Sequence, residues 1–245
     1  MMIAFGIPVF AAALLLAFTL WRRRSPASLR RIDAYDRLNR EAGLAVENGK
    51  RLHISLGRGN LFTSLGASAL AGLAMLRKLA ERTSVSDRPP IVTSGDAALT
   101  ILSQDTSQSG YRAAGAEEQF RVSAGRMTGL SPFAYAAGTI PVARDENVSA
   151  NILIGDLGAE SALMVEAADR QDSTLIAASD NLAGQSIFYA SAQDPLIGEE
   201  LFAAGAYVGA GASHEASLQV QDVLRWLVIL VILGGAAYRL LGFSF

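Results

Sequence analysis

The sequence predicts an α/β protein: an open, mostly parallel, three-layer sheet of Rossmann-like type, with one transmembrane helix before it and one after it. Two observations predict this class. Apolar segments lie at both ends of the 245 residues, and a strand, glycine, helix pattern recurs between them. At 51% hydrophobic and 18% charged residues, the chain is more apolar than a typical soluble domain. The expected organisation is a transmembrane helix at 1–21, a juxtamembrane amphipathic helix at 22–50, a cytoplasmic α/β domain at 51–208, a linker at 209–225 and a second transmembrane helix at 226–245.

The N-terminal apolar segment, residues 3–21, is uncharged and about as long as a helix needs to cross the hydrocarbon core. No Lys or Arg precedes it, whereas Trp21 and then Arg22, Arg23 and Arg24 close it. A signal peptide carries its positive charge in the opposite order. The positive-inside rule therefore predicts an external N-terminus and a cytoplasmic arginine flank.

The C-terminal segment, 226–245, is a weaker transmembrane candidate, because Arg239 interrupts its apolar residues. A buried core helix is the alternative, but Arg239 lies near the far end, where it can snorkel, and Trp226 suits the membrane interface beside Arg225. Two spans predict a protein of the cell (inner) membrane with both termini outside and the central domain in the cytoplasm. The absence of cysteine fits a reducing compartment.

Between the first span and the domain, Ser25 and Pro26 predict the start of a helix. Its apolar positions recur about every three residues, as in an amphipathic helix lying on the bilayer or on its own domain; they are Leu29, Ile32, Tyr35 and Leu38. A solvated face with no partner is the other interpretation.

The middle of the chain repeats one arrangement. RLHISLG alternates apolar and polar residues, ends at glycine and runs into a helix, for which Thr63 or Ser64 is the expected cap. PPIVTSGD, ANILIGDLG and STLIAASD follow the same pattern, which is typical of right-handed parallel βαβ units. Segments 120–125 and 186–192 add two possible strands, giving five or six, and helices are expected from Ser131 and over 195–209.

Ligands of such sheets bind outside the carboxyl ends of the strands, where helix N-termini favour anions. The candidate ligand-binding residues are therefore Gly57, Arg58, Gly59, Asn60, Ser94, Gly95, Asp96, Gly155, Asp156 and Asp180. Neither phosphate-loop motif is complete. Phe62 stands where a dinucleotide fingerprint has its third glycine, and the segment 59–66 is followed by Ala67 and Ser68, where a Walker loop needs lysine and then serine or threonine. Ordinary strand-to-helix turns, with Asp96 and Asp156 as helix caps, are the alternative.

Other chemistry finds little support, and no catalytic residue, metal site or cofactor is expected. The chain has two histidines and no cysteine, with His53 in a strand, where it is expected to pack against a neighbouring layer, and His214 in the linker. The adjacent pairs Glu117 with Glu118 and Glu199 with Glu200 point apart on any helix. A formal charge of −2 predicts no nucleic-acid binding, and lipid headgroups explain the basic cluster better than DNA.

RLHISLGRGN and the stretch ASALAGLAMLRKLAERTSVSDRPPIVTSGDAALTILSQD resemble a family of bacterial membrane proteins whose shared region is a domain of unknown function. SVSDRPPIVTSGD is the most distinctive part, and the resemblance covers most of the chain. It implies an α/β region with a membrane helix on each side. It implies no activity and no catalytic residue.

The expected function is that of a structural or interaction subunit, a scaffold held at the bilayer that associates with copies of itself or with other subunits of a membrane complex. Small residues at 234–237 would let helices approach closely in the bilayer. The alternative is a membrane-tethered ligand-binding or sensory domain for a nucleotide or other small anion. An enzyme with an unrecognised site is the third possibility.

Overall fold

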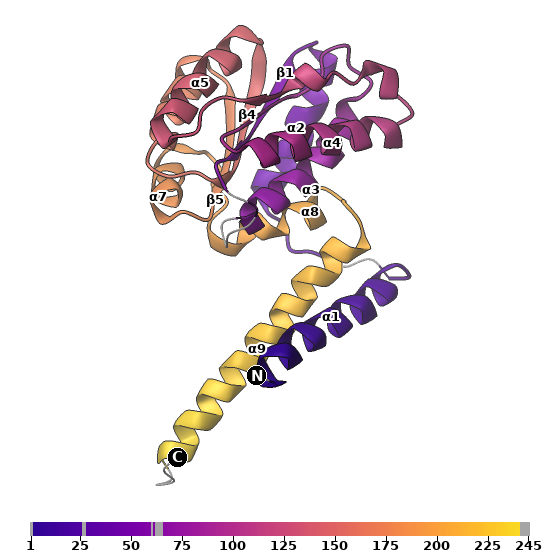
Figure 1. The fold of residues 1–245 in the computed structure, drawn as a ribbon, viewed down its shortest axis with the longest axis vertical. Coiled ribbons are helices and arrows are strands. Elements are labelled where there is room, and N and C mark those ends of the chain that lie inside the picture. The colour runs from indigo at the N-terminus through magenta and orange to yellow at the C-terminus, as the bar shows by residue number, and fades with distance from the viewer. Residues whose placement is uncertain (1, 26–27, 60, 62–65, 241–245) are drawn as a thin grey trace. The chain divides into compact units, whose positions relative to one another are not determined.

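The computed structural model describes residues 2–25, 28–59, 61 and 66–240. It divides into two compact units, one formed by Arg30–Ala210 and the other by Met1–Leu29 with Gly211–Phe245. Figure 1 shows the helices and strands of both units.

The α/β unit is built on one five-stranded sheet in which every pair of neighbouring strands is parallel. The strands are β1 (Arg51–Gly57), β2 (Ile91–Ser94), β3 (Gly125–Met127), β4 (Val148–Asp156) and β5 (Thr174–Ser179). Their order, β3-β2-β1-β4-β5, places the reversal of strand order between β1 and β4. This confirms the expected open, Rossmann-like α/β class.

Helices cover both faces of the sheet. Leu52, Ile54 and Leu56 of β1 belong to one core with α2 (Asp33–Glu47) and α3 (Gly66–Thr83), which also contains Leu99 of α4 (Ala97–Ala113). The other core joins Leu153 of β4 to α5 (Pro132–Asp145), α6 (Ser161–Arg170) and α7 (Leu182–Ser191). Strands β1 and β4 are buried on both faces, and most of their residues are apolar or small.

Helix α2 packs on its own domain. Tyr35 and Leu38 are buried, and the Tyr35 hydroxyl donates a hydrogen bond of 2.6 Å to the Glu200 carbonyl. The ring of Tyr35 stacks on Tyr207, and the Tyr207 hydroxyl donates to the Arg30 carbonyl at 2.7 Å. This amphipathic helix was expected to lie either on the bilayer or on its own domain. The structure shows the second arrangement, because the apolar face of α2 packs against the α/β unit.

Several expected element boundaries differ. Helix α2 begins at Asp33, and Pro26 lies outside the described residues, as do Thr63 and Ser64. Residues 186–192, expected as a strand, lie mostly in α7, whose first turn is capped by the Asn181 side chain. Residues 122–124 form a 3₁₀ turn, η2 (Val122–Ala124), so that β3 starts only at Gly125; a second such turn, η1 (Glu117–Gln119), precedes it. Residues 195–209 contain η3 (Gly198–Ala203) and the short α8 (Ala204–Tyr207).

The second unit is a pair of helices, α1 (Met2–Arg22) and α9 (Ala212–Leu240), that lie antiparallel along one another (Figure 1). Of the residues that the structure describes, only α9 forms a helix long and apolar enough to cross a membrane. Over its described side chains, Gly6–Arg22, α1 is apolar but shorter. Because α9 begins at Ala212, residues 212–225 are helical, where the sequence favoured a linker.

Candidate functional site

The carboxyl ends of β1 and β4 meet at the reversal of strand order. The Arg58 amide donates to the Asp156 carbonyl at 3.0 Å, and the Gly95 amide donates to the Gly57 carbonyl at 2.9 Å. Gly57 has a φ of +69°, and a Cβ added there would lie 2.5 Å from the Asp156 carbonyl oxygen. Glycine is therefore required for the exit from β1, and main-chain hydrogen bonds tie β1 to both neighbouring segments.

Arg58 is the cation of this edge. Its Nε lies 3.4 Å from a carboxylate oxygen of Glu160, whose side chain is only 4% exposed. A Cβ added at Gly95 would lie 2.5 Å from Cγ of Arg58, so the absence of a side chain at Gly95 leaves room for the arginine stem. The sequence singled out Arg58 and Gly95 but not Glu160, which stands two residues beyond a glycine in an otherwise ordinary turn.

Acidic groups outnumber Arg58 at this edge. Asp156 is 6% exposed, and burial raises the pKa of its carboxyl group, with the nearby charge of Asp180 acting in the same direction and that of Arg58 opposing it. One carboxylate oxygen of Asp180 is buried and has no hydrogen-bond partner among the residues that the structure describes. These buried acids suit a hydrogen-bond donor or a cation better than a phosphate group.

The helix N-termini at this edge already hold oxygen atoms of the chain itself. The Asp96 carboxylate accepts from the Leu99 amide at 2.9 Å, which confirms Asp96 as the cap of α4. The Asn181 side chain accepts from the Ala183 amide at 3.0 Å, and the Glu160 carboxylate accepts from the Gly158 amide at 3.1 Å, just before α6. Asp156 does not cap a helix, because it ends β4 and α6 begins only at Ser161.

The structure brings most of the sequence-derived candidates together, namely Gly57, Arg58, Gly95, Gly155, Asp156 and Asp180. Ser94 is the last residue of β2, and its hydroxyl hydrogen-bonds Thr100 of α4 at 2.5 Å, whereas Asp96 caps α4. Gly59 is buried after β1, and Asn60 lies outside the described residues.

His53 is buried in β1, as expected for a histidine that packs against a neighbouring layer. Its ring nitrogens lie 2.8 Å from the Asn151 side-chain oxygen and 2.9 Å from the Thr93 hydroxyl. Burial lowers the pKa of His53 to about 4. The Asn151 amide group in turn donates to Ser173 at 2.8 Å, so one hydrogen-bonded row crosses the sheet from β2 to the start of β5.

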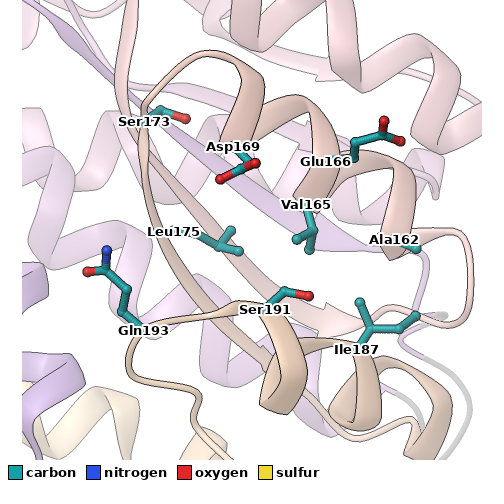
Figure 2. A pocket seen from close by; sticks show the side chains of 9 residues that line it. All are labelled: Ala162, Val165, Glu166, Asp169, Ser173, Leu175, Ile187, Ser191 and Gln193. Carbon is teal, nitrogen blue, oxygen red and sulfur yellow. The ribbon is translucent and has the colours of Figure 1, made fainter.

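Sequence reasoning missed a groove between α6 and α7. Figure 2 shows the apolar side chains Val165, Leu175 and Ile187, which line it. The volume of the groove is about 420 Å³. Asp169 and Ser191 stand on its two helical sides. Its lining residues are Ala162, Val165, Glu166, Asp169, Ser173, Leu175, Ile187, Ser191 and Gln193. The only signal in the sequence was the acidic pair Glu166 and Asp169, one helical turn apart beside apolar positions.

The expected membrane-interface residues lie on the helix pair. The Arg22 guanidinium stands over the Trp21 ring, 5.0 Å from its centroid, and Arg22 Nε donates to the Gln219 side chain at 3.0 Å. Arg225 pairs with Asp222 at 3.3 Å, within α9. Arg23, Arg24, Trp226 and Arg239 are exposed.

Fold and site together define a doubly wound α/β protein with an acidic carboxyl edge and a helix long and apolar enough to span a membrane. The chain belongs to the family described as Domain of unknown function (DUF6754), whose model matches residues 1–245. No curated protein and no solved structure matches the chain. Membership confirms the resemblance noted on RLHISLGRGN and SVSDRPPIVTSGD to a family with such a domain.

Proposed function

We propose that this protein is a membrane-anchored structural or interaction subunit that associates with copies of itself. The observation that carries the proposal is the apolar surface of α9. Trp226, Leu230 and Val231 are 64 to 66% exposed, and further large apolar side chains of this helix are exposed beside them. Water would solvate such a surface poorly, so it calls for lipid or another protein.

The proposed setting is the inner membrane, with two passes, both termini outside and the α/β unit in the cytoplasm. The antiparallel pairing of α1 with α9 supports it, because the contact of Arg22 with Gln219 sets Arg22, Arg23 and Arg24 at the same end of the pair as Arg225. All of these arginines then fall on the cytoplasmic side.

Reporter fusions test this topology. A fusion after Arg24 should report a cytoplasmic position, and fusions before residue 1 and after residue 245 should report external ones. A cytoplasmic signal from the C-terminal fusion would contradict the second span. An alkaline carbonate wash should leave the chain in the membrane pellet.

Self-association is proposed through the small residues of α9. A Cβ added at Gly234 or Gly235 would meet no other atom within 4 Å, so this face has room for a neighbouring helix. The mass of the detergent-solubilised chain, measured by light scattering, should exceed that of a monomer. Gly234→Leu should lower that mass, whereas Leu240→Ala, a change in the exposed last turn, should not. A monomeric wild-type chain would rule out self-association.

A ligand-binding or sensory role at the carboxyl edge is the second candidate. It is favoured by the position of Arg58, Asp156 and Asp180 at the edge where ligands of such sheets bind. Among the described residues, one buried carboxylate oxygen of Asp180 has no hydrogen-bond partner, and it fits a donor of a nucleotide, such as a ribose hydroxyl, and not a phosphate. A nucleotide or small anion would have to displace the oxygens that occupy the starts of α4 and α7. Mass spectrometry of the purified protein tests this, because a phosphate compound retained by the wild type and lost in Arg58→Gln would favour this role over the first.

A further inference from the structure

We propose that the groove between α6 and α7 binds an extended, basic segment of a partner protein. This inference names the class of partner for the proposed interaction function and therefore rests on it. Three properties of the groove support this: its apolar lining, the negative charge of its rim and the outer edge of β5 at Leu175, which precedes the part of that edge bonded to Leu196.

The apolar lining fits the stem of a long side chain. Val165 of α6, Leu175 of β5 and Ile187 of α7 converge from three elements on a space of about 420 Å³. Pockets of roughly 300 to 1,000 Å³ are typical of binding sites. Lysine and arginine bury their methylene stems on such surfaces and keep their charged ends in water.

The rim supplies the charge that these ends require. Asp169 is exposed, and no ion pair of its carboxylate occurs among the residues described. Glu166 lies one turn before it and pairs with Arg170 at 2.5 Å. The three charges leave one net negative charge beside the apolar lining, which complements a cation and opposes an acidic segment.

The edge of β5 offers main-chain groups. In a parallel strand, the amide and carbonyl of one residue point to the same side, and alternate residues point to opposite sides. The Ala177 carbonyl accepts from the Leu196 amide at 3.0 Å, on the side away from β4. Leu175, two residues earlier, therefore directs its amide and carbonyl to that same outer side, where an extended peptide could bond to them.

The test uses the full chain in a neutral detergent and a fluorescein-labelled peptide, Val-Lys-Val-Arg-Val, with anisotropy as the measurement. Binding should saturate, and it should weaken with added salt. The same peptide with glutamate in place of lysine and arginine should not bind. Detergent micelles without protein provide the blank.

Two variants separate groove binding from unspecific attraction. Asp169→Asn removes the charge at an exposed position and should weaken binding about tenfold. Ser191→Trp fills the groove and should abolish binding with the charge retained. The matched control is Glu118→Gln, an exposed acid on η1, which should leave the affinity unchanged.

Three results would overturn the inference. The peptide could fail to bind, it could bind Asp169→Asn as tightly as the wild type, or Asp169→Asn and Glu118→Gln could lose the same affinity. Light scattering on the same samples keeps the two proposals apart. If the chain self-associates but does not bind the peptide, only the proposal of peptide binding in the groove is refuted. If a monomeric chain binds the peptide, only the proposal of self-association is refuted.

Discussion

Gly155 of β4 lies so close to Leu56 of β1 that a Cβ added at Gly155 would stand 2.2 Å from the Leu56 carbonyl oxygen. Its φ of +135° is also one that other residues rarely adopt. The contact joins the two strands at the point where the strand order reverses.

Gly155→Ala should therefore destabilise the fold by about 3 kcal/mol or more, through both a main-chain clash and backbone strain. Urea denaturation followed by circular dichroism measures the change. Gly43→Ala is the control, because a Cβ at this helical position of α2 would meet nothing within 4 Å. It should stabilise the chain slightly, by about 0.5 to 1 kcal/mol. Similar effects of the two changes would contradict this account.

Tyr35→Phe should cost about 1 kcal/mol, because it removes one buried hydroxyl and leaves the Glu200 carbonyl without its donor. Tyr189→Phe changes a side chain that is 76% exposed and should leave the denaturation midpoint unchanged. An unchanged stability of Tyr35→Phe would mean that the hydroxyl contributes nothing to the packing of α2.

The pH dependence of stability should reveal His53. Its pKa falls from 6.5 to about 4 on folding, so the unfolded chain binds the proton more readily. The stabilisation is complete above pH 6.5 and declines as the pH drops toward 4, by roughly 3 kcal/mol at about 1.36 kcal/mol per pH unit. The raised pKa of Asp156 acts in the opposite sense.

Unfolding midpoints between pH 7.5 and 4.5 should fall more steeply for the wild type than for His53→Gln. Parallel curves for wild type and His53→Gln would show that His53 does not control this transition.

Asp180→Asn should stabilise the folded chain near pH 7 by about 0.5 to 1 kcal/mol, because it removes a like charge beside buried Asp156. It should also lower the pKa of the Asp156 carboxyl group, which carbon NMR of the labelled side chain can follow. Glu118→Gln should change neither quantity. A destabilised Asp180→Asn chain would indicate that the carboxylate of Asp180 has a partner that supports the fold.

Much of the sheet followed from local patterns. Alternation in RLHISLG, small residues at strand ends and Asp96 ahead of a helix predicted β1 and the start of α4, because these signals act over a few residues. The strand predicted over residues 186–192 was wrong, because a short run with isoleucine and aromatic residues is as typical of a strand as of a buried helix face. Only packing of Phe188 against the sheet decides between them.

The site was less accessible to sequence reasoning. That Gly57 and Gly155 stand on adjacent strands depends on the strand order, which no local pattern encodes. Only the fold brings Glu160 and Asp180 close to Asp156. Residues of α6, β5 and α7 line the groove together, so no local sequence motif predicts it.

The hydrogen bond from Tyr207 to Arg30 places the first and last parts of the α/β unit side by side. A unit whose ends adjoin can be joined head to tail by a short linker and reopened at another surface turn without rerouting the chain through the sheet. Circular permutation is thus open to this fold, and so is its insertion as a cassette into a loop of another protein.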